Sequence, residues 1–203
     1  MNKKSIIICI LTIFFFILVF LIKTDPITNF DISIYNFLAL SMNDNLTNIF
    51  KSITFLGSGI SIASFCVLSV IICIYLEKRD IGIIIAACVT FNSLFSEGLK
   101  MVIQRPRPEI MQLTRKSSFS FPSSHTLASV SLCGIILYFV LKSEADKNLK
   151  IIFSTILVLL PVLIGISRIY LGVHNASDVL GGAILAMILL LIEISIIEKK
   201  GYI

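Results

Sequence analysis

Residues 5–22 read SIIICILTIFFFILVFLI, an apolar stretch without a formal charge. An α-helix needs roughly 20 mostly apolar residues to cross the hydrocarbon core of a bilayer, so this stretch predicts a membrane span. Five further stretches have the same character: residues 52–76, 81–96, 117–141, 151–167 and 179–192. We therefore expect an all-α polytopic membrane protein, a single domain over residues 1–203 with six transmembrane helices in a bundle.

The composition agrees with a membrane location and argues against nucleic acid as a partner. Hydrophobic residues make up 57% of the chain, and the mean hydropathy is +0.99. The positive-inside rule explains the net charge of +5, because a cytoplasmic amino terminus places many basic residues in four short cytoplasmic segments. These are Lys3, Lys4, Lys78, Arg79, Lys142, Lys147, Lys150, Lys199 and Lys200. We expect a multi-pass protein of the cell membrane with cytoplasmic termini and the bilayer as its partner; the sequence carries no signal for an oligomeric state.

This topology brings four helix ends to the outer face of the membrane. The third span ends near Lys100, the fourth begins near Pro122, the fifth ends near Arg168 and the sixth begins near Asp178. Most of the unusual polar residues of the chain lie at these four ends. We therefore expect a functional site at the outer face.

Two loops on the outer side have candidate roles that the sequence does not decide. Phe30, Ile34, Phe37 and Leu38 recur at helical spacing, which predicts a short interfacial helix that acts as a connector or as a gate for substrate. The loop of residues 109–121, which contains Arg115 and Lys116, is a candidate for head-group selection.

The first polar motif is EGLKMVIQRPRP, residues 97–108. A charged residue at the bilayer centre costs about 2.5 to 3.5 kcal/mol on insertion scales, so a Glu, a Lys and two Arg at the end of a span indicate a polar cavity or the interface. Proline ends the helix, and Arg105 and Arg107 therefore lie where the chain leaves the membrane. Glu97, one turn before Lys100, is expected to orient that lysine by ion pairing.

The second motif is FPSSHT, residues 121–126, at the start of the fourth span. Ser123 or Ser124 is suited to cap the helix, whose free N–H groups and positive dipole end favour an anion such as phosphate. His125 lies in the first turn and is expected to face the same space.

The third motif is SRIYLGVHNASD, residues 167–178. If the sixth span begins near Asn175, His174 and Asp178 share one helix face. The carboxylate then fixes the imidazole tautomer and leaves the other ring nitrogen free as a base or nucleophile. Arg168 supplies a planar cationic fork suited to phosphate oxygens.

Together these residues describe a site for phosphoryl transfer without a metal ion. Lys100, Arg107 and Arg168 would bind the phosphate oxygens in the transition state. His174 would attack phosphorus to form a phosphohistidine, His125 would protonate the leaving oxygen and then activate water, and Asp178 would orient His174. The nearby acids do not form a cluster suited to a magnesium pair, so we expect no metal and no cofactor.

The motifs resemble those of the type 2 phosphatidic acid phosphatase superfamily, integral-membrane lipid phosphatases related to vanadium haloperoxidases. The family signature is a Lys followed after six residues by Arg-Pro, then Pro-Ser-Gly-His, then Ser-Arg with His after five residues and Asp after three more. Here these are Lys100 with Arg107-Pro108, Pro122-Ser123-Ser124-His125, and Ser167-Arg168 with His174 and Asp178. The sequence departs from the pattern at Ser124, where the family has glycine.

The resemblance implies the same roles for the three cations, the two histidines and the aspartate. It adds Ser123 and the backbone of Ser124 as donors of hydrogen bonds to the phosphate. If the glycine position required a positive φ, serine would be costly there; its small size favours retained activity. The family places this site at the outer face and acts on lipid phosphates or diphosphates.

Several functions fit this resemblance. The first expectation is dephosphorylation of undecaprenyl diphosphate at the outer leaflet; the alternatives are a phosphatidylglycerophosphate or phosphatidate phosphatase, or a lipid phosphotransferase. A lipid-binding or transport protein on the same fold is the alternative without catalysis. A haem protein with His125 and His174 as axial ligands is disfavoured, because these histidines lie beside Arg168, Asp178 and Ser124.

Overall fold

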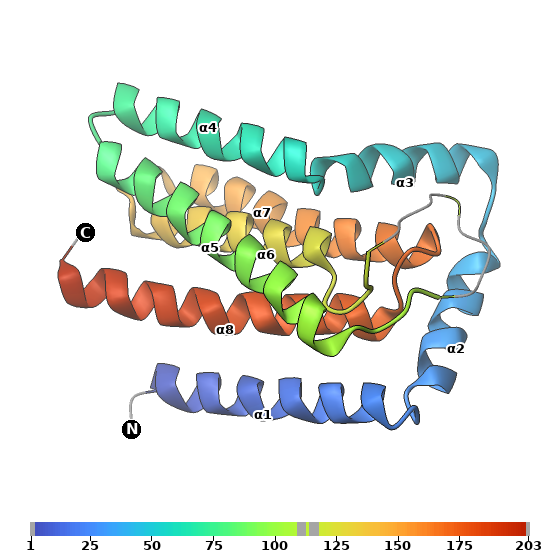
Figure 1. Cartoon of the computed structure of the whole chain (residues 1–203). Helices are drawn as coiled ribbons and strands as arrows, with labels where there is room; N and C mark the ends of the chain where they lie inside the picture. The colour runs from blue at the N-terminus through green and yellow to red at the C-terminus, as the bar shows by residue number, and fades with distance from the viewer. Residues whose placement is uncertain (1–2, 109–112, 114–117, 202–203) are drawn as a thin grey trace.

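The computed structural model describes residues 3–108, 113 and 118–201, and in this part of the chain all regular structure is α-helical (Figure 1). The residues proposed for head-group selection, Arg115 and Lys116, lie outside the described residues. Eight helices follow one another: α1 (Lys3–Lys23), α2 (Thr28–Ala39), α3 (Asp44–Leu56), α4 (Gly59–Tyr75), α5 (Arg79–Ile103), α6 (Ser124–Lys142), α7 (Lys147–Tyr170) and α8 (Ala176–Lys200).

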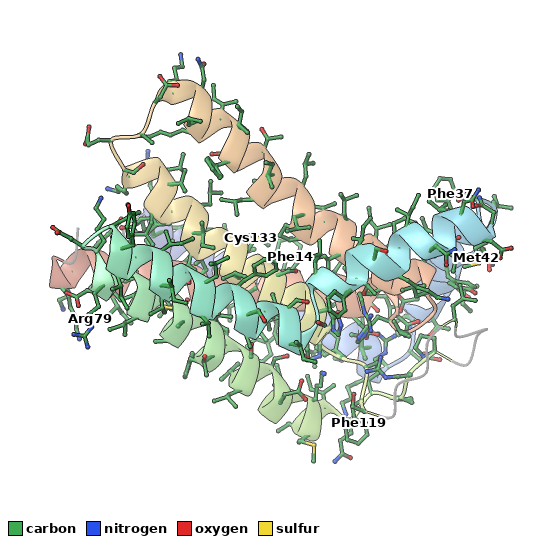
Figure 2. The ribbon with its side chains drawn as sticks, turned by 90° about the horizontal axis from the view of Figure 1, so that it is seen from above. Phe14, Phe37, Met42, Arg79, Phe119 and Cys133 are labelled. Atoms are coloured by element: carbon green, nitrogen blue, oxygen red, sulfur yellow. The ribbon has the colours of Figure 1, made fainter. Side chains whose placement is uncertain are left out.

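Six segments of the described chain are long and apolar enough to cross a membrane, if α3 and α4 together count as one. The predicted all-α fold with six spans is confirmed in this sense. Large apolar side chains such as Ile13, Phe16 and Ile60 lie exposed on the outside of the bundle, and Figure 2 shows carbon-rich side chains projecting from its helices. This arrangement suits lipid as the surrounding solvent.

The second span differs from the prediction, which had one stretch over residues 52–76. The chain instead bends by 49° between α3 and α4. Ser58 starts a new helix, because its side chain accepts a hydrogen bond from the backbone N–H of Ser61. Gly57 lies so close to α7 that an added Cβ would be 2.7 Å from Ile164, so this contact requires glycine.

The fourth span begins at Ser124, close to the predicted start near Pro122 but after the first residues of the apolar stretch 117–141. The backbone N–H of Ser120 donates to the carbonyl of Arg105, and that of Ser123 donates to the carbonyl of Asp178. These donors are used outside the helix, because the segment before α6 is held against the residues that follow α5 and against α8.

The bundle has one end at which α5 ends, α6 begins, α7 ends and α8 begins, which we call the site end (Figure 1). The start of α1 and the end of α8 lie at the opposite end. Figure 2 shows Arg79 at that opposite end and Phe119 close to the site end of α5. The buried and polar functional residues therefore gather at one end of a largely apolar structure.

The predicted short helix between the first two spans is confirmed as α2, which lies across the site end (Figure 1). Its apolar residues were the basis of that prediction. Its single buried residue, however, is Asp31, which is only 3% exposed. A buried carboxylate needs polar partners, and those of Asp31 belong to the site described next.

Candidate active site

A cavity of about 790 Å³ opens at the site end, between α4 and α5. Six of the eight residues predicted to form the site line it: Lys100, Arg107, Ser124, His125, Arg168 and His174. The other two, Ser123 and Asp178, are fully buried. The structure thus brings the three sequence motifs together, with Asp178 beside His174 and Ser123 at the start of α6.

Three cationic side chains surround the polar part of this cavity. Lys100 is 5% exposed and pairs with Glu97, whose Oε1 lies 3.0 Å from Nζ, as the sequence predicted. Arg107 donates from Nε to the carbonyl of Ser118 over 2.7 Å. Arg168 is 2% exposed, and its Nε has no hydrogen-bond partner among the described residues. Three cations beside one carboxylate make the cavity suited to an anion.

Burial acts on the guanidinium of Arg107, which lies outside the membrane-spanning helices. It lowers the pKa of Arg107 below its ordinary value, although the carboxylates of Asp178 and Glu97 oppose this shift. An arginine remains protonated at neutral pH even so, because its ordinary pKa is above 12. Arg107 therefore presents a full positive charge to the cavity.

The imidazole of His174 lies between a carboxylate and a guanidinium. Its Nδ1 is 3.5 Å from Oδ2 of Asp178, and its Nε2 is 3.4 Å from Nη1 of Arg107. The first distance exceeds the ~2.7 to 2.9 Å of a charge-assisted hydrogen bond, and Nδ1 has no hydrogen-bond partner among the described residues. Catalytic hydrogen bonds are often long before substrate binds.

The prediction that His174 and Asp178 share one helix face is wrong in detail. α8 begins at Ala176, so His174 precedes the helix while Asp178 lies in its first turn. Oδ2 of Asp178 accepts a hydrogen bond of 2.9 Å from the backbone N–H of Asn175. This bond turns the chain back over the helix start and brings His174 next to the carboxylate.

Burial makes His174 neutral at physiological pH. The ring is 2% exposed, and burial lowers the pKa of His174 to about 4. Asp178 opposes this shift, whereas the charges of Arg168 and Arg107 add to it. A neutral ring with its proton on Nδ1, beside Asp178, leaves a lone pair on Nε2 at the cavity wall. That nitrogen can attack an electrophile bound by the cations.

Two glycines of α8 allow the segment before α6 to pack closely against that helix. A Cβ on Gly181 would lie 2.2 Å from the ring of Phe121, and one on Gly182 would lie 2.7 Å from the carbonyl oxygen of Ser123. These glycines allow the start of α6 to approach α8, and Ser124 and His125 of its first turn line the same cavity as His174 and Arg168.

The two serines of the second motif have different surroundings. The Ser123 hydroxyl accepts a hydrogen bond from Thr126 and does not cap the helix by its side chain. The Ser124 hydroxyl donates to Oε1 of Glu97 over 2.7 Å. Ser124 is not among the described residues with a positive φ, so serine is accommodated at the family's glycine position without backbone strain.

Two residues without a predicted role, Arg105 and Asp31, lie behind the site. Arg105 donates to Asp178 over 2.6 Å and to Asp31 over 2.9 Å. Burial alone would lower the pKa of Arg105, but the Asp178 and Asp31 carboxylates raise it above the ordinary value. The repeated Arg-Pro was the only sequence signal for Arg105, and Asp31 lies far away in the chain.

The cavity continues as an apolar groove toward the middle of the bundle. Side chains of α4 and α5 line it, among them Ile62, Cys66, Val70, Ala86 and Val89. The groove joins the cationic end directly to the lipid-facing part of the protein. Its shape and chemistry suit a ligand with a phosphate head and a long apolar tail.

Comparison with known proteins agrees with this geometry. The sequence model of the PAP2 superfamily matches residues 81–202. The chain is 32% identical to phosphatidylglycerophosphatase B of Bacillus subtilis over 93% of this chain and 94% of that protein. It is 31% identical to dolichyldiphosphatase 1 of Dictyostelium discoideum over 63% of this chain and 58% of that protein.

A solved structure shows the same fold. It is that of a transmembrane PAP2-type phosphatidylglycerolphosphate phosphatase from Bacillus subtilis, with a TM-score of 0.88 and 31% identity over 98% of both chains. The chain belongs to the PAP2 superfamily and is a membrane lipid phosphatase, as the resemblance of its three motifs to the type 2 phosphatidic acid phosphatases implied.

Proposed function

We propose that the protein hydrolyses a lipid phosphate without a metal ion, through a phosphohistidine at His174. One observation carries this proposal: a neutral, buried imidazole is in contact with both Asp178 and Arg107 at the wall of a cavity that three cations surround. A nucleophile, an orienting carboxylate and phosphate-binding cations are the groups that this chemistry needs.

In the first step, Nε2 of His174 attacks phosphorus, and the bond between phosphorus and the lipid oxygen breaks. His125, which lines the cavity, gives its proton to that oxygen. The Nδ1 proton of His174 stays beside Asp178, which stabilises the positive charge on the ring. The products of this step are the dephosphorylated lipid and a phosphohistidine.

In the second step, water attacks phosphorus and His125 accepts a proton from it. The bond between nitrogen and phosphorus breaks, and inorganic phosphate leaves. With a diphosphate substrate, the lipid leaves the first step as a monophosphate.

Lys100, Arg107 and Arg168 stabilise the charge on the phosphate oxygens. The Nε of Arg168, which has no hydrogen-bond partner in the described part of the chain, is a donor available for one of them. The N–H groups at the start of α6, including that of Ser124, supply further donors. Ser123 is assigned only a supporting role, because its side chain is fully buried and is not among the described residues that line the cavity.

The favoured substrate is phosphatidylglycerophosphate. The sequence-based expectation places undecaprenyl diphosphate first and phosphatidylglycerophosphate among the alternatives. Support comes from the relative of that name, which aligns with nearly the whole chain. The carboxylate of Glu97 also lines the cavity beside Lys100. It would accept a hydrogen bond from a glycerol hydroxyl, whereas it would repel a second phosphate.

Undecaprenyl diphosphate is the second candidate. The dolichyldiphosphatase relative supports it, because dolichyl and undecaprenyl diphosphates are both long isoprenoid diphosphates. The long apolar groove between α4 and α5 would take either tail. Phosphatidate is the third candidate.

We assign the site to the outer face of the cell membrane, with both chain ends in the cytoplasm. The nine basic residues of the predicted cytoplasmic segments lie at one end of the bundle, opposite the site end. They are at or next to the ends of α1 and of α4 to α8 that meet there. The positive-inside rule places that end in the cytoplasm.

The test is phosphate release by the purified protein in detergent with excess chelator, from phosphatidylglycerophosphate and undecaprenyl diphosphate in parallel. Wild type is expected to release phosphate, and His174→Ala is expected to release none. Labelled substrate, quenched in base, should leave label on wild-type protein and none on His174→Ala, because a phosphohistidine survives base.

Other outcomes would separate the alternatives. No release from these two lipids or from phosphatidate, the third candidate, would favour a lipid-binding or transport protein. Label that passes to an added alcohol instead of water would identify a phosphotransferase. Loss of activity with the chelator, restored by a metal ion, would overturn the metal-independent mechanism.

A further inference from the structure

Two carboxylates are buried behind the cavity, and one guanidinium lies between them. Asp31 is 3% exposed, Asp178 is fully buried, and Arg105 donates to both. Burying two carboxylates is costly unless they are paired and hydrogen-bonded. Ser177 donates to Asp31 from its backbone N–H over 2.8 Å and from its hydroxyl over 2.6 Å.

The contacts of Asp178 divide between its two oxygens. Oδ1 accepts the hydrogen bond from Nη1 of Arg105, and Ser120 Oγ lies 3.5 Å from the same oxygen. Oδ2 faces the other way, toward the backbone N–H of Asn175 and Nδ1 of His174. Arg105 and the N–H of Asn175 therefore hold the two oxygens from opposite sides, which fixes the plane of the carboxylate relative to the histidine.

The second terminal nitrogen of the Arg105 guanidinium contacts a residue of α2. Nη2 of Arg105 donates to Oδ2 of Asp31, and Asp31 in turn accepts from the N–H of Ser177 in the first turn of α8. A carboxylate at a helix start is favoured by the free N–H groups and the helix dipole. Only the planar fork of arginine has separate nitrogens for two carboxylates; the single ammonium of lysine does not.

We infer that Arg105, held by Asp31 of α2, is a positioning residue that keeps Oδ2 of Asp178 facing Nδ1 of His174. This inference rests on the proposed role of His174. Arg105 is not among the described residues that line the cavity, so it acts through Asp178 and not on substrate. It also gives the interfacial helix α2 a function, because α2 carries the carboxylate that anchors Arg105.

The first test compares Arg105→Gln and Arg105→Lys with wild type on the same lipid. We expect kcat to fall by about 10- to 100-fold in Arg105→Gln, by analogy with the loss when partners that orient a metal-binding histidine are removed. KM should change little. Arg105→Lys should recover only part of kcat, because it keeps the charge but loses the fork.

The pH profile gives a readout that a folding defect would not change. The charged groups that face His174 are Asp178 of α8, Arg168 of α7 and Arg107 of the segment after α5, and all three remain in the variants. If Arg105 positions Asp178, its loss lets the carboxylate turn away from Nδ1, so the imidazolium is stabilised less and the acid limb of kcat/KM moves to lower pH in Arg105→Gln. If Arg105 acts only through its charge, the charge of Asp178 is less compensated and the acid limb moves to higher pH.

The double variant Asp31→Asn with Arg105→Gln separates positioning from charge balance. It removes one carboxylate together with the guanidinium, so it should fold even if Arg105→Gln alone does not. Positioning predicts that kcat stays as low as in Arg105→Gln. A purely structural role predicts recovery toward wild type. Arg79→Gln, an exposed arginine at the opposite end of the bundle, is the matched control and should behave as wild type.

Three results would overturn the inference: wild-type kcat and pH profile in Arg105→Gln, an acid limb that moves to higher pH in that variant, or recovery of kcat in the double variant. Measuring His174→Ala in the same assay distinguishes failure of this inference from failure of the proposed function. If His174→Ala is active, the proposed function fails. If it is inactive while the Arg105 variants are normal, only the positioning inference fails.

Discussion

Arg168 of α7 donates a hydrogen bond of 2.8 Å from Nη1 to the hydroxyl of Thr54 in α3. Thr54 lies in the last turn of α3, immediately before the bend at Gly57. The bent second span therefore brings a side chain to the phosphate-binding end of the cavity, although none of the three sequence motifs includes it.

Replacing Thr54 with valine should weaken the binding of the phosphate by Arg168. A hydrogen bond to a charged group contributes about 1.5 to 3 kcal/mol, so its loss should lower kcat/KM by roughly 10-fold or more. Thr54→Ser keeps the hydroxyl and should remain close to wild type. Steady-state kinetics with one lipid would check this. Equal losses in both variants would mean that the methyl group, and not the hydrogen bond, matters.

Activity should persist in acid well below the ordinary titration of histidine. Burial lowers the pKa of His174 to about 4, and the attacking ring must be neutral. The acid limb of kcat/KM reports the free enzyme, so it should fall near pH 4 and not near 6.5. A pH profile in detergent, with folding followed by circular dichroism, would check this. An acid limb near pH 6.5 in folded protein would contradict the burial of the ring.

Glu97→Gln should weaken activity modestly and change the preference between lipids. The carboxylate holds Lys100 and accepts from Ser124, so its loss removes orientation but no reacting group. The ratio of kcat/KM for undecaprenyl diphosphate to that for phosphatidylglycerophosphate should rise, because a negative charge leaves the cavity. Activity lost as fully as in His174→Ala would instead give Glu97 a direct part in the chemistry.

Filling the apolar groove should affect long lipids and spare short ones. Ala86 of α5 lines the groove, so Ala86→Phe should raise KM for a long-chain lipid phosphate. Hydrolysis of a short-chain analogue, which does not need the groove, should be unchanged. Phe14→Trp, at an exposed position of α1, is the control. Equal effects on long and short substrates would show that the tail does not lie between α4 and α5.

The sequence by itself determined the membrane fold and predicted which residues gather at the cavity. Uninterrupted apolar stretches reveal spans because every lipid-exposed backbone must be helical, and this requirement acts on each segment separately. The motif spacing then placed Lys100, Arg107, His125, Arg168 and His174 at one end of the bundle, where the structure finds all five at the cavity.

Only the tertiary structure decided how those residues are held. The bend at Gly57 depends on contact with Ile164, and the partners of Arg105 come from α2 and α8. Asp31 and Asp178 are 147 residues apart in the chain, so no local pattern links them. Burial and long-range pairing depend on which helices become neighbours, and composition and spacing do not specify this.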